Sequence, residues 1–167
     1  MKKTLLTIIA LLLVASVGYC QEGWELTRQY SKLGLKMLPV LRDKLKTGTP
    51  EEKEEVLYIF MELHIVELIP QVIESILDDT VSPRHDDTGW GNVYHQAATA
   101  MCKFAYKIDG ISQKERGYEK FSFSSDVGTA TEQRRKEVYN NWLKWWKNNQ
   151  VKILASPKVK EQFSKKE

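Results

Sequence analysis

The sequence predicts an all-α protein, built as a small α-solenoid of antiparallel helix hairpins and closed by a tryptophan-rich helix near its C-terminus. The first observation is a repeated pattern, Leu38–Pro39 and Ile69–Pro70, whose prolines are 31 residues apart. A period in the thirties is typical of stacked helix pairs. The second observation is a punctuated helix start between the two patterns. The third is an alanine-rich segment after residue 92 with apolar residues at helical spacing.

Residues 1–20 have the layout of a secretory signal peptide: Lys2 and Lys3, an apolar run from Leu5 to Val17, and small residues after it. The run is shorter than the roughly 20 residues that span a bilayer, which disfavours a membrane anchor. We therefore expect an exported protein of a bacterial envelope, periplasmic or secreted. The alternative is a lipoprotein, because the four residues that end at Cys20 resemble a lipobox, from which Tyr19 departs.

Charge limits the class of partner. The whole chain has a formal charge of +3, and removal of residues 1–20 leaves +1. This balance, together with export, argues against a nucleic-acid partner. The charges are uneven, with eleven acids between Glu51 and Asp87 and ten Lys or Arg from Thr131 to the end. These residues are either ordinary solvated helix faces or two ends that attract different partners.

We expect the first hairpin in residues 21–47. Its first helix covers residues 21–33 and ends at Gly34. The second begins near Met37 with Pro39 in its first turn, where a missing N–H costs nothing. The side chains expected to be buried are Trp24, Tyr30, Leu33, Leu38, Leu41 and Leu45.

The second hairpin begins at the clearest helix start of the chain. Thr49 is expected to be the N-cap, with Pro50 in the first helical position and Glu52 completing a capping box. The connection at His64 is short, so the following helix must fold back antiparallel. The expected buried stripes are Val56, Ile59, Phe60 and Leu63 on one helix and Leu68 or Ile69, Val72, Ile73, Ile76 and Leu77 on the other.

Residues 30–108 resemble the short HEAT-like repeats of bacterial proteins. The segment from Lys36 to Phe60 is similar to a second repeat helix, a turn and the next first helix. The segment from Leu68 to Asp79 is similar to a second helix with its closing aspartate. Asp87 to Cys102 resembles the loop and alanine-rich first helix of a further repeat. The resemblance implies about six helices in two to three stackable hairpins and a protein-binding role.

The remaining segments are a loop over residues 80–92, a helix that opens at Val93, and an irregular insert at 109–128. Ala98, Cys102 and Ala105 form a row of small side chains on that helix. Residues 120–125 alternate like a short strand but have no obvious partner, so we expect the insert to be irregular, with a small hairpin as the alternative. A last helix, capped by Thr129 with Glu132, is expected to run to about Asn149. The predicted domains are thus the signal peptide 1–20, a HEAT-like domain 21–149 and a basic polar tail 150–167.

The sequence favours a non-catalytic protein-interaction or scaffold module. Its binding surface is expected on the row of second helices, at the polar positions beside the apolar stripes. The partner is expected to be another protein. The candidate residues are Arg42, Lys46, Gln71, Glu74, Ser75 and Asp78.

The alternative is an envelope enzyme or metal-dependent factor centred on His85, Asp87 and His95, whose nitrogen and oxygen ligands suit a divalent ion. A solvated acidic loop is the competing interpretation of these residues. The chain has no Gly-x-Ser-x-Gly motif and no phosphate-binding glycine loop, and we expect no cofactor. Cys102 lies among small residues and is expected to be a buried packing residue rather than a nucleophile.

The tryptophans Trp142, Trp145 and Trp146 have three interpretations. They cover the last exposed stripe of the solenoid, they form a platform for a carbohydrate or peptide, or, with the nearby lysines, they contact a membrane surface. Three such positions of one helix cannot all be buried, so we expect one, with Trp145 as the candidate, to be available for binding. Membrane association through this basic helix or through a lipidated Cys20 therefore remains open.

Overall fold

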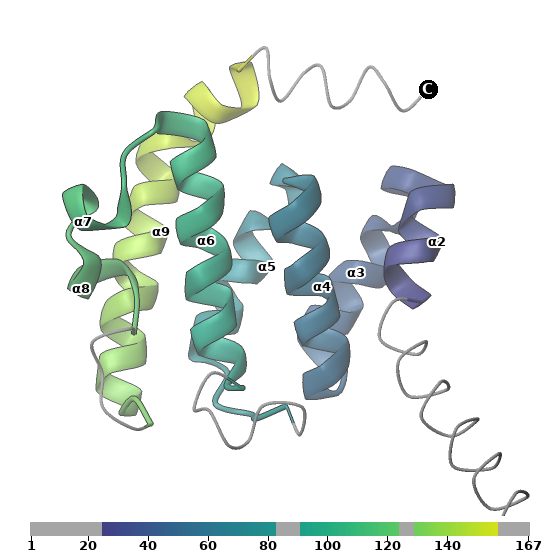
Figure 1. Cartoon of the computed structure of the whole chain (residues 1–167), viewed down its shortest axis with the longest axis horizontal. Helices are drawn as coiled ribbons and strands as arrows, with labels where there is room; N and C mark the ends of the chain where they lie inside the picture. The colour runs from purple at the N-terminus through teal and green to yellow at the C-terminus, as the bar shows by residue number, and fades with distance from the viewer. Residues whose placement is uncertain (1–24, 83–90, 124–128, 157–167) are drawn as a thin grey trace, which may run out of the picture.

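The described chain is a bundle of α-helices. The computed structural model describes residues 25–82, 91–123 and 129–156 (Figure 1). Within these ranges the chain forms no β-strand, and its only β-type pairing is an isolated bridge between Val81 and Asn92. The all-α prediction is therefore confirmed. The α-helices are α2 (Glu25–Leu33), α3 (Leu38–Thr47), α4 (Pro50–Leu63), α5 (Ile69–Glu74), α6 (Val93–Asp109), α7 (Gln113–Arg116), α8 (Tyr118–Phe121) and α9 (Glu132–Ala155).

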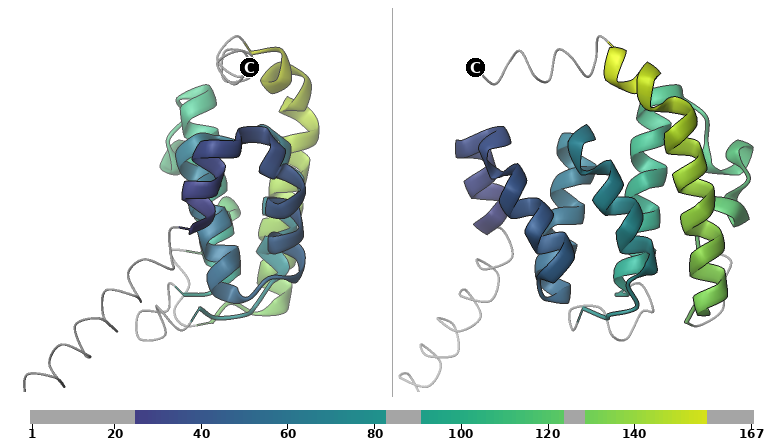
Figure 2. Two further views of the ribbon diagram at one scale, coloured as in Figure 1. Left: turned by 90° about the vertical axis from the view of Figure 1, so that its right-hand side faces the viewer. Right: turned by 180° about the vertical axis from the view of Figure 1, so that it is seen from behind.

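The long helices form two layers. Helices α2, α4 and α6 lie side by side in one layer, and α3, α5 and α9 lie in the other (Figures 1 and 2). The left view of Figure 2 looks along the stack and shows the two layers edge-on. Helix α3 packs on α4, α5 packs on α6, and α9 contacts both α5 and α6. Each layer thus covers the apolar face of the other.

The turns between the layers use left-handed backbone. Helices α2, α4 and α6 are followed by Gly34, His64 and Gly110, with φ of 56°, 53° and 72°. After Gly34 and after His64 the chain makes a short 3-10 helix, Gly34–Met37 and Val66–Leu68, and then enters α3 or α5. Pro39 and Pro70 lie in the first turns of these two helices, and the position of Pro39 was predicted. The Thr49–Glu52 capping box of α4 is also confirmed.

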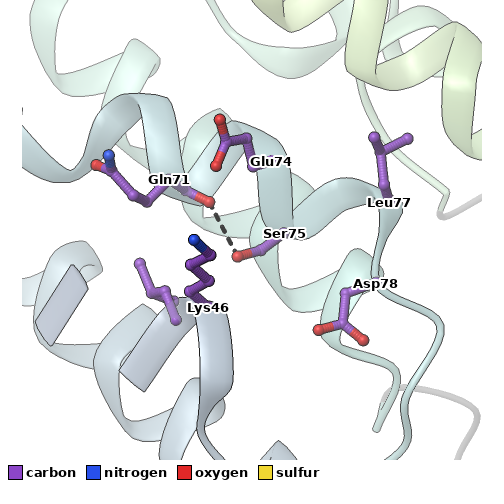
Figure 3. A pocket seen from close by; sticks show the side chains of 7 residues that line it. Lys46, Gln71, Glu74, Ser75, Leu77 and Asp78 are labelled. Carbon is purple, nitrogen blue, oxygen red and sulfur yellow. Dashed lines mark hydrogen bonds between the residues drawn. The ribbon is translucent and has the colours of Figure 1, made fainter. Parts of the chain in front are cut away.

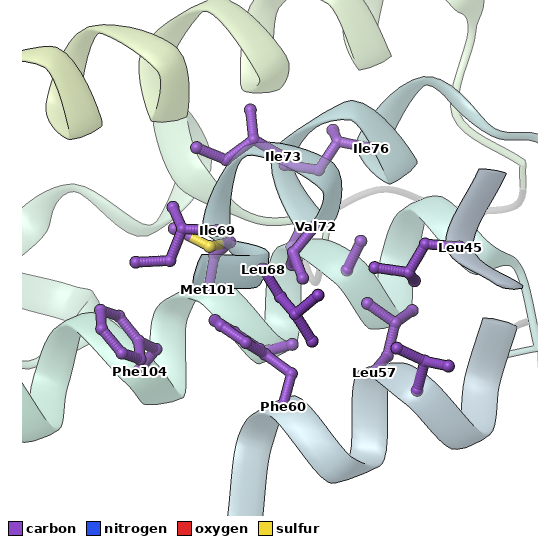
Figure 4. Packing of buried hydrophobic residues seen from close by; sticks show 14 of the residues in the cluster. Leu45, Leu57, Phe60, Leu68, Ile69, Val72, Ile73, Ile76, Met101 and Phe104 are labelled. Carbon is purple, nitrogen blue, oxygen red and sulfur yellow. The ribbon is translucent and has the colours of Figure 1, made fainter. Parts of the chain in front are cut away.

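Most of the predicted apolar positions are buried between the layers (Figure 4). Leu38 is only partly buried, and the prediction is wrong for Leu33, Leu63 and Leu77, which are exposed. Each of these three exposed leucines is the last residue of its helix, so the chain turns away there before a neighbouring helix can cover the side chain. Trp24 lies outside the described residues. The confirmed core positions include Tyr30, Leu41, Leu45, Val56, Ile59, Phe60, Val72, Ile73, Ile76, Val93, Ala97 and Phe104.

The insert at 109–128, predicted to be irregular or a small hairpin, contains two short helices. Ser112 and Glu115 form a capping box at the start of α7, and α8 follows after Gly117. Phe121 closes α8 and packs edge-on against Trp142, with ring centroids 4.8 Å apart. The two aromatic residues of this stretch therefore pack on different helices, Phe121 on Trp142 of α9 and Phe123 on Tyr94 of α6. Residues 124–128 lie outside the described ranges.

Helix α9 differs from its predicted limits and runs parallel to α6. Its N-cap is Thr131 rather than Thr129, and it runs past Asn149 to Ala155 because Ile153 still reaches the core. The Ala130 N–H donates to Tyr94 Oη at 3.0 Å, so α9 and α6 begin at the same end and run parallel. The α7–α8 segment returns the chain to that end. No helix within the described ranges, α9 included, has both the length and the apolar character needed to cross a membrane.

Candidate binding site between α3 and α5

A pocket of about 300 Å³ opens between the end of α3 and the outer side of α5 (Figure 3). It contains five of the predicted binding residues, supplied by two neighbouring helices of one layer. Arg42 and Trp145, also predicted, are not among its lining residues. The lining residues are Leu45, Lys46, Gln71, Glu74, Ser75, Leu77 and Asp78.

Helical phase explains why these polar residues share the pocket. Val72, Ile73 and Ile76 turn into the core, so Glu74, which lies between them in the sequence, faces outward, whereas Ser75 is buried where it lines the pocket. The 3-10 helix Ser75–Leu77 tightens the last turn of α5 and brings Leu77 to the pocket wall. Across from it, Leu45 is buried, and Lys46 follows it on the exposed side of α3. The pocket thus has an apolar wall from each helix and a polar rim.

The α5 side of the pocket is held by a local hydrogen bond. Ser75 Oγ donates to the Gln71 carbonyl at 3.0 Å, drawn as the dashed line in Figure 3. This bond fixes the serine rotamer and uses the hydroxyl proton inside the helix. Gln71 Oε1, in contrast, is a buried acceptor with no hydrogen-bond partner in the described part of the chain.

Asp78 is fixed by the fold rather than free in the pocket. Lys53 Nζ, from α4, donates to Asp78 Oδ2 at 2.5 Å, and the Thr80 N–H and hydroxyl both donate to Asp78 Oδ1. Burial by itself would raise the pKa of Asp78, but the Lys53 ammonium and the two Thr80 donors outweigh it, so the pKa lies below its ordinary value. Asp78 therefore stays ionised and ties the end of α5 to the start of α4.

Lys46 and Glu74 are the other two charged residues of the pocket. Both side chains are exposed. Within the described ranges neither forms an ion pair or a side-chain hydrogen bond, with each other or with a third group. A cation and an anion thus stand on opposite walls of one pocket, each without an internal partner. This arrangement suits a ligand that presents both an acidic and a basic group.

Arg42 and Trp145 have other contacts. Arg42 Nη2 donates to the Glu67 carbonyl at 3.2 Å, which ties α3 to the 3-10 helix before α5. Trp145 is only partly buried, but its ring packs edge-on against Trp142 and lies beneath the guanidinium of Arg116, 5.6 Å from the ring centroid. Trp145 therefore belongs to the packing between α7 and α9, and it is separate from the pocket.

The residues of the metal hypothesis are only partly described. His85 and Asp87 lie outside the described residues. His95 is buried in α6, and its ring lies 6.3 Å from the ring of Phe123. Within the described ranges no three His, Cys, Asp or Glu side chains lie close enough together to hold a metal ion.

Cys102 is buried, as predicted, on the face of α6 that packs toward α8. Its Sγ lies 3.6 Å from the Phe121 carbonyl. Burial raises the pKa of the Cys102 thiol to about 11, so the thiolate that nucleophilic chemistry requires is scarce at neutral pH.

Sequence reasoning missed three contributors to the pocket. Leu45 and Leu77 were assigned to the core stripes, but both line the pocket, and Lys53, which holds Asp78, was not named as a site residue. The spacing of 25 residues between Lys53 and Asp78 carries no local signal. Comparison with family models, with curated proteins and with solved structures gives no match for this chain.

Proposed function

We propose that this protein is a non-catalytic protein-interaction module of HEAT-like helical repeats, and that its partner binds over the pocket between α3 and α5. The observation that carries the proposal is the pair of unpaired charges, Lys46 and Glu74, on opposite walls of a pocket with two leucine walls. Protein interfaces combine such an apolar centre with a polar rim.

The internal repeat supports the HEAT-like part of the proposal. Gly34 and His64 are equivalent left-handed turns 30 residues apart, and each is followed by a 3-10 helix and a proline-started helix. Gly110 repeats the left-handed turn at the end of α6. In this view α2–α3 and α4–α5 are two repeats, α6 begins a third, and α9 closes the row in the opposite direction. An end element of this kind covers the stripe that further repeats would otherwise bury.

The chemistry of the pocket fits a protein segment better than a small metabolite. Its volume of about 300 Å³ is at the lower limit for drug-sized ligands. Its Asp78 carboxylate is already held by Lys53 and Thr80. Glu74 is placed for a lysine or arginine of the partner, and Lys46 for an aspartate or glutamate. The leucines supply the apolar contact between them. We place the protein in the bacterial envelope, on the basis of the signal-like residues 1–20.

Photocrosslinking in the source cells tests the proposal. A photoreactive amino acid at Lys46 should give a discrete adduct with one partner, and the same group at Lys114, an exposed position on α7, should not. Glu74→Lys should abolish the Lys46 adduct, because it reverses one of the two charges. Glu119→Lys is the matched control at an exposed acid outside the pocket, and the adduct should persist in it.

The proposal fails if Lys46 and Lys114 give the same adducts. It also fails if the Lys46 adduct survives Glu74→Lys, since the partner would then be near the pocket without using its charges.

A further inference from the structure

The outer face of α9 is a second surface with a distinct composition. At 100° per residue, Trp142, Trp146 and Ile153 lie on the face that packs against the helical bundle. The opposite face carries Lys144, Lys147, Val151 and Leu154, and all four side chains are exposed. Helix α9 therefore packs against the helical bundle without using this second face.

All the charged side chains of the outer face are positive. From residue 138 to the end of the helix, α9 has three lysines, at 144, 147 and 152, and no acidic residue. In the described part of the chain none of these lysines forms an ion pair. Lys136, one turn before this stretch, is in contrast neutralised by Glu132. The positive charge is thus concentrated on the second half of the helix.

Exposed aliphatic side chains lie on the same face. Val151 is 76% exposed and Leu154 is 50% exposed, while Ile153 between them is buried. Because the helix has 24 residues against 17 in α6, its last turns (yellow in Figure 1) extend past the end of α6. No described element covers these two side chains, so they project together from the end of the molecule.

We infer that this face binds the surface of an anionic lipid bilayer. Helices that lie at a membrane surface carry lysines beside exposed aliphatic side chains. The ammonium groups contact lipid phosphates, and the aliphatic side chains enter the headgroup layer. A bilayer needs no shaped counterpart, and this face contributes neither a residue of the pocket between α3 and α5 nor an aromatic side chain. The tryptophans face the core or α7, so lysine and aliphatic side chains make this contact. The inference does not depend on the pocket between α3 and α5.

Vesicle flotation of the full chain tests the inference. The probes are phosphatidylcholine vesicles and the same vesicles with about 30 mol% phosphatidylglycerol, and the measured quantity is the gain in partitioning caused by the anionic lipid. Each lysine near an anionic surface contributes about fivefold, so Lys144→Gln with Lys147→Gln should reduce that gain about 25-fold. Val151→Ser with Leu154→Ser should also reduce binding while leaving the charge unchanged.

The matched control is Lys32→Gln with Lys36→Gln. It removes the same charge from exposed positions on α2 and the following 3-10 helix. This control should keep the gain within twofold of wild type. The inference is overturned if anionic lipid gives no gain, if the control loses as much as the α9 variant, or if the serine variant binds like wild type. It is also overturned if size-exclusion chromatography shows that the α9 lysines instead hold two copies of the chain together.

Discussion

Replacing Asp78 by asparagine should destabilise the protein through a specific loss. The Lys53–Asp78 contact joins the first turn of α4 to the end of α5 at 2.5 Å, with side chains 11% and 18% exposed. Asparagine can still accept from Thr80, but it leaves the Lys53 ammonium poorly hydrated and without its anion. Removing one partner of a fully buried pair costs roughly 3–5 kcal/mol. Because some water reaches this pair, we expect a loss of about 2–3 kcal/mol in the free energy of unfolding.

Urea unfolding followed by far-UV circular dichroism measures this loss. With a slope of about 2 kcal/mol per molar urea, the midpoint should fall by about 1–1.5 M. Glu74→Gln, at an exposed and unpaired carboxylate one turn away, is the control and should change stability by less than about 0.5 kcal/mol. In combination with Lys53→Met the loss should be smaller than the sum of the two single losses, because the second change removes a charge that is already unpaired. Additive losses would refute the pairing.

The pH dependence of this effect has a definite sign. The pKa of Asp78 is lower in the folded protein than in the unfolded chain, so the contact stabilises the fold above the unfolded pKa. That stabilisation is lost as the pH falls through the folded pKa. The difference between wild type and Asp78→Asn should therefore be full at neutral pH and shrink in acid. A difference that stayed constant down to about pH 2 would show that the charge is not involved.

Three further predictions concern other buried groups. Trp142→Ala removes a fully buried ring and the hydrogen bond from Nε1 to the Phe121 carbonyl. Thermal unfolding should show a loss of about 3–5 kcal/mol in the free energy of unfolding. A loss below about 1 kcal/mol would contradict the packing of α9. Burial, aided by the positive charge of Lys107, lowers the pKa of His64, so the free energy of unfolding should fall as the pH drops below 6.5. His64→Asn keeps a residue that tolerates the left-handed turn. In a pH series this variant should show a weaker dependence of stability on pH. The pKa of Cys102 is about 11, against an ordinary value of 9.0. At pH 8 the thiol should therefore react with a thiol reagent about 100-fold more slowly in the folded protein than in urea. Equal rates would show that the thiol is exposed.

Local chemistry made the helix starts of the first two hairpins predictable. The Thr49–Glu52 capping box and the proline starts of α3 and α5 depend on neighbours within a few residues, and all three are where the sequence placed them. The capping-box pattern gave the wrong N-cap for α9. Thr129 is followed three residues later by the acid Glu132, whereas the N-cap in the structure, Thr131, is followed at the same spacing by Arg134. The capping-box pattern was not applied at Ser112, because residues 109–128 were predicted to be an irregular insert.

Long-range geometry was less accessible. The parallel course of α6 and α9 depends on where the α7–α8 segment is fastened, through the Trp142 indole and the Asn141 amide to carbonyls of α8, and no periodicity reports that. Lys46, Gln71 and Glu74 could be predicted because helical phase separates the outer positions of α3 and α5 from their core positions. The leucine walls could not, since an apolar residue at a helix end gives the same signal whether it faces the core or a pocket.

The central claim is that a partner protein binds through the charges of the pocket between α3 and α5. The most direct test is a calorimetric titration of the crosslinked partner, once purified, into wild type, Glu74→Lys and the control Glu119→Lys. Reversing a charge that meets its opposite at an interface costs at least about 1.4 kcal/mol, or tenfold in affinity. We predict at least that loss for Glu74→Lys and less than a twofold change for Glu119→Lys. Equal affinities for all three proteins would contradict the claim.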